Sequence, residues 1–469
     1  MVDKFGRTFT ISRQYPLVAT AIAAVLSASG QANATPPSLA EATNPGYWFV
    51  IAGSSAAESS IAAAVGNIIC GGAENMLTVQ SRTSPETGEG SDNFFAFSCF
   101  PVAAYEATVE PSVVNVYYRA EGGSIVGALP IVNNTQIKRL NLSDTSCGVS
   151  GVSGTSGLCV VSAASATAGT QDGWTGAVTP DYVHLGITDV EPGKLTGANF
   201  PSNYSKTAFG SATPAQLGTL GTMRLYQQVF GLVVNTSGGQ FLSPISLGIE
   251  AAANIMLGNY TDWNAVPNPT TGAPLTSTHL AITRVDTSPG TGTRAAANIF
   301  FLNYGCGNTN AIDSTGEAVF SSTADALTQA NSIPGAITYT TIDQILTPSN
   351  HAKWPNLALV SIGNTAPSNL AAAVGSYGFW YEATMIPNEA GITAEPEITP
   401  QFAYSWLYYF NMFEHALLGP PLAVNAPDIN PIPNYDGYAP SLPLTPASTG
   451  YVSLFTRAGN SCNVPLEQN

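Results

Sequence analysis

Apolar runs of two kinds alternate along the first half of the chain. The stretch 47–70 begins with β-branched and aromatic residues, breaks at a Gly-Ser-Ser turn (53–55) and continues as an Ala/Ile pattern typical of a helix. The stretch 112–132 repeats this arrangement around a Gly-Gly-Ser turn, and 182–195 contains a third short strand that ends near Asp189. Repeated strand–turn–helix units predict an α/β fold with mixed, mainly parallel sheets.

The same pattern begins again at residue 229. Residues 229–235 form a buried-strand pattern, and the run 246–264 has the apolar face of a helix. Predicted strands at 279–286 and 334–342 lie on either side of a predicted helix at 322–333. These elements predict a second α/β lobe.

The length of the chain also favours two lobes, because single cores stop growing at about 250–300 residues. Apolar segments near residues 228 and 378 have the pattern of strands that cross between lobes. We therefore expect a discontinuous first lobe, 35–228 with 378–469, and a second lobe, 229–377.

The N-terminus has the pattern of a secretory signal peptide, so we expect residues 1–34 to be removed. Lys4, Arg7 and Arg13 precede a short apolar stretch, and the Ala-Asn-Ala sequence at 32–34 resembles a cleavage site. The apolar stretch is shorter than the roughly 20 residues that span a bilayer, and no cysteine follows the cleavage site to take a lipid. The sequence predicts an exported protein, periplasmic or secreted, without membrane insertion.

The mature chain would be strongly acidic, with 11 basic and 29 acidic residues and a net charge of about −18. A field of that sign repels nucleic acid and anionic membrane surfaces, so neither is an expected partner. Any anion that this protein binds must be held by local dipoles and a few cations.

Six cysteines follow the predicted cleavage site, and an even count in an exported chain predicts three disulfides. Cys147 and Cys159 enclose a Gly/Ser-rich loop that a local bridge would close. The other two bridges are assigned as Cys70–Cys99 and Cys306–Cys462, although six cysteines allow 15 pairings. A metal site is disfavoured because no C-x-x-C sequence or histidine cluster is present.

Charged residues make up only 9% of the chain, so the cluster in 284–297 (RVDTSPGTGTRAAA) is informative. Arg284 and Arg294 enclose Asp286 and a Thr-Gly-Thr turn just before an Ala-rich helical run. If one of these threonines caps the helix, free N–H groups and the positive end of the helix dipole create an anion site. The alternative is an ordinary capped helix with an Arg–Asp pair on the surface. A P-loop is excluded because its lysine is absent.

Small hydroxyl residues occupy three strand-to-helix turns, at Ser54-Ser55, Ser124 and Thr291. Each alone is typical of a helix N-cap, but together they favour a common site. Asp189, which follows a predicted strand, is either a loop cap or part of that site. A carboxylate among anion-binding turns accepts a hydrogen bond from a protonated oxyanion and repels a fully ionised one, which would select hydrogen phosphate over sulfate.

Several segments together resemble the phosphate-binding proteins of bacterial ABC transporters. They are HLGITDVEPGKL, FGLVVN, EAAANIMLGNYTDWN, AITRVDTSPGTGTRAAANIFFL and IPGAITY, in that order over about residues 180–345. IAGSSAAESSI and AEGGSIVGALPI extend the resemblance more weakly to the front. The resemblance implies a class II periplasmic binding-protein fold, in which two α/β lobes close on an oxyanion in the cleft between them.

The resemblance also implies binding residues in the first lobe. By position, Ser54, Ser55 and Ala56 would offer turn groups to the oxyanion. Ser124 would offer a hydroxyl group, and Asp189 would be the carboxylate that accepts the ligand's proton.

In the second lobe, the resemblance implies that Arg284 makes the direct charge pair and that Asp286 orients it. Thr291, Gly292 and Thr293 would donate hydroxyl and backbone N–H bonds. The sequence departs from the family here, because four residues, Thr-Ser-Pro-Gly, lengthen the spacer before the turn. Segments 70–105 and 140–180 match nothing in the family.

We therefore predict a monomeric, exported binding protein for inorganic phosphate or a similar small oxyanion, without a cofactor. Phosphate uptake would make an ABC permease its partner. The alternative is a secreted surface or matrix protein that reuses the fold without a transport role. An enzyme is disfavoured because no Gly-x-Ser-x-Gly or H-E-x-x-H motif occurs and the histidines are scattered: His184, His279, His351 and His415.

Overall fold

The structure is a computed structural model. It describes residues 35–82, 91–101, 112–150, 155–163, 174–200, 209–242, 245–315, 317–320, 322–346, 352–388, 431–432, 451–452 and 455–467. The predicted signal peptide lies outside these residues, as do His351 and His415. The described residues form an α/β fold, as the sequence predicts.

The first group of elements, here called the N-terminal part (residues 39–200), is built on a mixed sheet. Its strands are β1 (Tyr47–Gly53), β2 (Leu77–Arg82), β3 (Ser91–Cys99), β4 (Val114–Arg119), β6 (Gly148–Ser150), β7 (Ser156–Ala163), β8 (Trp174–Gly176) and β10 (Leu185–Thr188). β1 is paired in parallel with both β4 and β10, and its almost entirely buried apolar sequence is typical of such a central strand. β5 (Gln136–Leu140) and β9 (Val178–Tyr182) form a separate antiparallel pair.

Helices of the N-terminal part follow its parallel strands, as predicted. They are α3 (Glu58–Ala64), which follows a short 3-10 turn η1 (Ser55–Ala57), and α4 (Ser124–Asn133). α4 begins after Gly123, whose positive φ of 70° favours glycine, and ends at Asn134 in the left-handed conformation. Smaller helices are α2 (Leu39–Ala42), η2 (Val65–Ile69), η3 (Ala73–Asn75), η5 (Pro192–Lys194) and η6 (Gly197–Asn199), with α5 (Pro214–Gly218) following.

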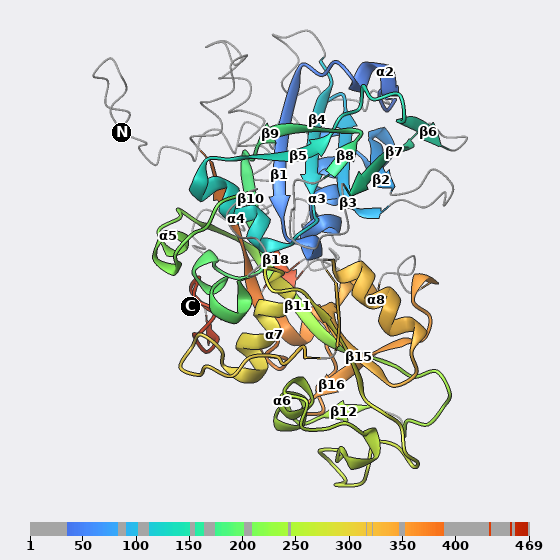
Figure 1. Ribbon diagram of the computed structural model, residues 1–469, viewed down its shortest axis with the longest axis vertical. Coiled ribbons are helices and arrows are strands. Elements are labelled where there is room, and N and C mark those ends of the chain that lie inside the picture. The colour runs from blue at the N-terminus through green and yellow to red at the C-terminus, as the bar shows by residue number, and fades with distance from the viewer. Residues whose placement is uncertain are drawn as a thin grey trace.

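The second group, here called the central part (residues 246–373), has its own strands and helices. The strands are β12 (Ser246–Leu247), β13 (Thr283–Thr287), β14 (Ala318–Phe320), β15 (Ala336–Thr341) and β16 (Leu357–Ile362). The helices are α6 (Ile249–Met256), η7 (Trp263–Ala265), α7 (Gly292–Leu302), α8 (Thr323–Ser332), α9 (Asp343–Leu346) and α11 (Asn369–Ala373). In Figure 1 this part, in yellow and orange, lies below the blue and cyan N-terminal part.

Two long strands join the two parts, β11 (Met223–Asn235) and β17 (Trp380–Pro387). The first half of β11 pairs with β17, while residues 230–235 pair with β15 and β16 of the central part. β17 in turn pairs with β10 of the N-terminal part. Crossing strands therefore occur close to residues 228 and 378, where the sequence predicts them, and β11 begins earlier than expected, at Met223.

Buried apolar side chains form three clusters. The largest contains residues of both parts and of the crossing strands, for example Val126, Phe230 and Ala296. A second belongs to the N-terminal part and the crossing strands, and a third to the central part and β11. Because the largest cluster runs through both parts, the division into lobes 35–228 with 378–469 and 229–377 stays a prediction.

All three predicted disulfides are present. Cys70–Cys99 and Cys147–Cys159 lie within the N-terminal part, with Cα–Cα distances of 5.5 and 4.0 Å. Cys306–Cys462 joins the central part to the C-terminal segment, with a Cα–Cα distance of 5.3 Å. No helix among the described residues has the length and apolar character needed to cross a membrane.

Candidate anion-binding site

The ends of three strands and the start of one helix meet at the Asp189 carboxylate, which is buried where the N-terminal and central parts touch. Asp189 follows β10, and its Oδ1 atom accepts a hydrogen bond from Ser54 Oγ in the turn after β1. Its Oδ2 atom accepts from Ser124 Oγ, 3.2 Å away, after β4. From the central part, Gly292 packs so closely that a Cβ atom there would overlap Asp189 Oδ2 and Ser124 Oγ. The structure thus brings together Ser54, Ser124, Asp189 and Gly292.

Two helices begin at this carboxylate, and neither has a side-chain cap. The N-cap residue of α4 is Gly123, which has no side chain, and that of α7 is Thr291, whose side chain does not bond the first turn of the helix. The two N-terminal turns also touch, because Ile125 N donates to Gly290 O at 2.9 Å. Free N–H groups and helix dipoles favour negative charge at such a point. Asp189 is the negative group that occupies it here.

Burial raises the pKa of the Asp189 carboxyl to about 6, although hydrogen bonds from Ser54 and Ser124 act in the opposite direction. The nearby carboxylate of Asp343 raises this pKa further. No lysine or arginine in the described part of the chain forms an ion pair with Asp189. The site therefore has a carboxyl group close to protonation at neutral pH, among hydroxyl and backbone donors.

Ser55 and Ala56 lie beside this cluster rather than in it. Ser55 Oγ is 3.2 Å from Thr323 Oγ1 at the start of α8, which is a further contact between the two parts. Ala56 N donates to Ser54 Oγ at 3.1 Å and so orients that hydroxyl group. Ala56 also lines a neighbouring cavity, whose other lining residues are Ser60, Tyr226, Gln228, Val229, Ile342, Asp343 and Asn369.

Asp343 is a residue of this region that the sequence analysis missed. It follows β15 as Asp189 follows β10, and burial raises its pKa to about 6 as well. The available signal was a carboxylate at the end of a strand pattern, in the sequence TTID. The same rule that selected Asp189 would have selected Asp343.

The guanidinium group of Arg284 is directed toward Met256, Asp313 and Glu317. Its NH1 atom donates to Met256 O at 2.9 Å and to Asp313 O at 2.6 Å, and its NH2 atom pairs with Glu317 at 2.9 Å. Within the described residues, the side-chain hydrogen bonds of Arg284 go to these three partners. The structure therefore does not bring Arg284 together with Asp189.

Arg294, not Arg284, is the arginine that forms an ion pair with Asp286, at 3.8 Å. Its NH1 atom also donates to Ser314 Oγ at 2.7 Å, and Ser314 donates to Asp286 at 2.8 Å. Burial raises the pKa of Asp286, and the charge of Arg294 offsets part of that effect. A carboxylate therefore lies beside the arginine in the first turn of α7, where the helix dipole disfavours positive charge, and the pair is buried rather than on the surface.

The Thr-Gly-Thr turn presents its backbone, not its hydroxyl groups, to Asp189. Thr291 Oγ1 donates to Thr287 Oγ1 at 2.8 Å, and Thr293 Oγ1 is 3.4 Å from the same atom. The longer spacer before the turn reaches the N-terminal part, because Gly290 N donates to Asn199 O at 2.8 Å. Gly292, at the first position of α7, is the part of the turn that contacts Asp189.

The described histidines have structural partners. His184 is buried and its Nδ1 atom accepts from Val50 N at 3.0 Å, while the exposed His279 pairs with Asp262. No group of three or more His, Cys, Asp or Glu side chains that could hold a metal ion occurs among the residues the structure describes.

Comparisons with known proteins find solved structures only; no protein-family model and no curated protein sequence matches the chain. A Clostridium perfringens protein described as a phosphate ABC transporter substrate-binding protein, with bound phosphate, is 12% identical, with 49% of this chain and 72% of that chain covered and a TM-score of 0.32. An ABC-type phosphate transport receptor from Vibrio cholerae is 14% identical, with 49% of this chain and 74% of that chain covered and a TM-score of 0.30. A high affinity periplasmic phosphate-binding protein (PfluDING), bound with phosphate, is 17% identical, with 69% of this chain and 77% of that chain covered and a TM-score of 0.30. At these identities and TM-scores the similarity is distant.

Proposed function

We propose that this chain is an exported solute-binding protein that holds inorganic phosphate, or a similar small oxyanion, between the N-terminal and central parts. The observation that supports this most directly is the buried Asp189 carboxylate between the uncapped N-termini of α4 and α7. Helix N-termini and serine hydroxyl groups donate hydrogen bonds to an oxyanion. Asp189 accepts the proton that hydrogen phosphate carries and sulfate lacks.

Ligand entry requires the two parts to separate, because Gly292 now packs against Asp189. A hinge at β11 and β17 would allow this movement. When the parts close again on the ligand, Ser54, Ser124 and the backbone of the Thr-Gly-Thr turn would surround it. A direct charge pair with Arg284 requires its ion pair with Glu317 to exchange for the oxyanion.

Calorimetric titration of residues 35–469 with phosphate, arsenate and sulfate tests the proposal. We expect heat of binding with phosphate and arsenate and weaker binding of sulfate. Asp189→Asn should bind sulfate better relative to phosphate, since an amide can donate where the carboxylate could only accept. An absence of heat with all three anions would overturn the proposal.

The role of Arg284 has its own test. If Arg284 pairs with the oxyanion, Arg284→Ala should weaken the binding of all three anions, because truncating one partner of a buried charge pair costs roughly 2–5 kcal/mol of binding free energy. Glu317→Gln, which frees the guanidinium group, should leave binding intact or strengthen it. Unchanged affinities in Arg284→Ala would show that this side chain only holds Asp313 and Glu317 in place.

Uptake through an ABC permease and a monomeric state belong to the same proposal. The second candidate, a secreted surface or matrix protein without a transport role, is favoured by one observation: Ser54 and Ser124 already donate their hydroxyl hydrogen bonds to Asp189. Anion titration separates the two candidates, because the second predicts no binding.

A further inference from the structure

Residues 455–467, here called the C-terminal segment, lie across the junction between the two parts. The segment contains the short antiparallel strands β20 (Phe455–Thr456) and β21 (Leu466–Glu467). Two other short strands, β18 (Pro431–Ile432) and β19 (Tyr451–Val452), precede it. Its contacts reach the N-terminal part, the central part and the crossing strand β17.

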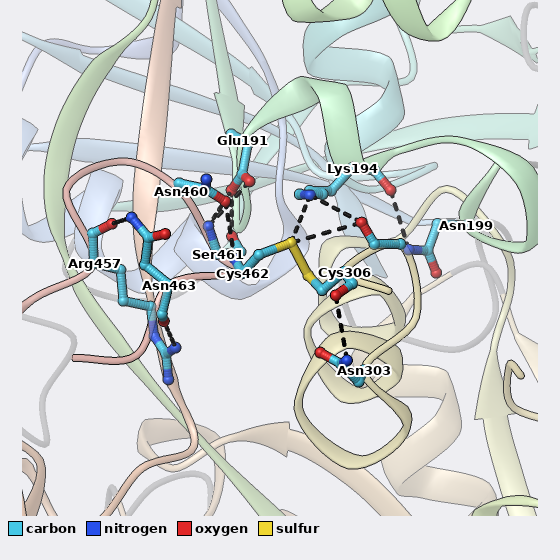
Figure 2. Close-up of a disulfide and its surroundings, with 11 residues drawn as sticks. Glu191, Lys194, Asn199, Asn303, Cys306, Arg457, Asn460, Ser461, Cys462 and Asn463 are labelled. Atoms are coloured by element: carbon cyan, nitrogen blue, oxygen red, sulfur yellow. Dashed lines mark hydrogen bonds between the residues drawn. A yellow bond between two sulfur atoms is a disulfide. The ribbon is translucent and has the colours of Figure 1, made fainter. Parts of the chain in front are cut away.

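Two consecutive residues of the segment connect the N-terminal part to the central part. Ser461 N is 3.0 Å from both carboxylate oxygens of Glu191, and Ser461 Oγ donates to the same carboxylate. Glu191 follows β10 in the N-terminal part. The next residue, Cys462, forms the disulfide with Cys306, which follows α7 in the central part. Figure 2 shows both connections on either side of the Ser461–Cys462 peptide.

The start of the segment is fixed to β17 by Arg457. The buried Arg457 guanidinium donates to Trp380 O at 3.1 Å and lies over the rings of Trp380 and Tyr381, 4.8 and 4.7 Å from their centroids. Glu382 of the same strand accepts from the backbone N–H groups of Arg457 and Gly459, at 3.1 and 2.7 Å. The segment is thus anchored to the crossing strand independently of the disulfide.

Next to the disulfide, the two parts contact each other only through non-covalent bonds among the described residues. Asn298 Nδ2 of α7 donates to Asn199 Oδ1 at 2.7 Å, and Ala198 N donates to Tyr304 Oη at 2.6 Å. Such bonds can exchange for bonds to water when the parts separate. A disulfide cannot.

We propose that the C-terminal segment is a clasp that limits how far the N-terminal and central parts separate, with Cys306–Cys462 as its covalent lock. Consecutive Cα atoms are about 3.8 Å apart, so Cys462 cannot follow Cys306 away from the N-terminal part unless Ser461 leaves Glu191. Glu191 is mostly buried, and burial raises its pKa. Losing the bonds from Ser461 would leave this carboxylate without those donors, which opposes opening. Without the disulfide, the central part can move while the segment stays on Glu191 and β17.

Hydrogen exchange of the full mature chain, residues 35–469, tests the clasp without any ligand. The reporters are the amides of Ile125 and Gly290, which bond across the junction to Gly290 O and Asn199 O. We expect Cys306→Ser/Cys462→Ser to accelerate exchange in peptides with these amides by at least about tenfold, as local opening becomes more frequent. Peptides from β1 and β15 should keep their wild-type rates.

Cys147→Ser/Cys159→Ser is the matched control, since both of its cysteines lie in the N-terminal part. It should leave the two reporter amides unchanged. Wild-type exchange rates at the two reporter amides in Cys306→Ser/Cys462→Ser, here called the clasp variant, would overturn the proposal. Equal acceleration in the control, or acceleration throughout the clasp variant, would also overturn it, because the disulfide would then act on global stability alone.

If the clasp variant does not fold, the same measurement can be made on the folded wild type after mild reduction. A dithiol reagent reduces the disulfide to two thiols and is itself oxidised to a cyclic disulfide. Cys306 and Cys462 are partly exposed, whereas Cys70 and Cys99 are fully buried, so the clasp should be reduced before that bridge. Faster exchange at the two reporter amides is again expected, and wild-type rates would again overturn the proposal.

Discussion

Asp189→Asn is expected to gain stability relative to the wild type as the pH rises from about 4 through 6, because it lacks a loss that the wild type shows. Below about pH 4 the two proteins should have the same pH dependence. The carboxyl has a pKa of about 6 in the folded protein, against an ordinary value of 3.8. Its protonated form is thus favoured by folding, so the stability that it contributes is complete below about pH 4 and is lost as the pH rises through 6. Asparagine does not titrate, and the variant should not show this loss.

The magnitude follows from the difference between the two pKa values. A shift of about 2 pKa units corresponds to about 3 kcal/mol of unfolding free energy between pH 4 and pH 8. Asp343, with a pKa also near 6, is present in both proteins and its titration cancels in the comparison. The amide can satisfy only one of the two serine hydroxyl donors as an acceptor, which costs roughly 1 kcal/mol at every pH. The change with pH, rather than the absolute stability, is therefore the quantity to compare.

Urea unfolding at pH 4, 6 and 8, followed by tryptophan fluorescence, measures this quantity. Asp144→Asn is the control, because hydrogen bonds from Ser146 lower the pKa of that partly exposed carboxyl and its contribution has the opposite sign. The reasoning is refuted if the stability difference between Asp189→Asn and wild type is the same at pH 4 and pH 8. It is also refuted if Asp144→Asn shows an equal gain with rising pH.

Three further substitutions have expected outcomes. Gly292→Ala should lower the melting temperature and abolish phosphate-induced stabilisation, because its Cβ would overlap Asp189 and Ser124. Gly218→Ala is the control, since its Cβ would meet no atom within 4 Å, and it should keep the wild-type melting temperature and stabilisation. A normal phosphate-induced thermal shift in Gly292→Ala would contradict this. Removing Cys147–Cys159 should lower the unfolding free energy by about 3 kcal/mol, the chain-entropy value for so short a loop, and non-reducing peptide mapping that finds Cys147 unpaired in the wild type would exclude it. Trp263→Ala should lower the free energy of unfolding in urea by roughly 3–5 kcal/mol, because a fully buried indole and its hydrogen bond to Gly335 O are lost. A loss below about 1 kcal/mol would show that the side chains around Trp263 are not packed as described.

The secondary structure near the candidate site was predictable from the sequence. The strand before Ser54, the helix after Gly123 and the helix after Thr291 all follow from the spacing of apolar residues and from small residues at the turns. These signals act over a few residues of chain, so they survive whatever the rest of the fold does. The three disulfides were also predicted, and Asp189 was correctly placed after a strand.

The partners of the buried charges were decided by the tertiary structure. Arg284 and Asp286 lie in one short motif, yet the structure pairs Arg284 with Glu317 and gives Asp286 to Arg294. The meeting of Ser124 with Asp189 likewise depends on strands 65 residues apart in the chain. A sequence shows that a buried charge needs a partner, but which group lies within hydrogen-bond distance depends on how distant elements pack.

The C-terminal segment illustrates the same limit most clearly. The sequence predicts the Cys306–Cys462 bridge, but nothing local indicates that Ser461 binds Glu191, 270 residues earlier in the chain. Local patterns determine strands, turns and helices because the forces that select them are short-ranged. The connection of two parts of the molecule by one short segment depends on contacts between residues that are far apart in the chain, and only the folded arrangement specifies those contacts.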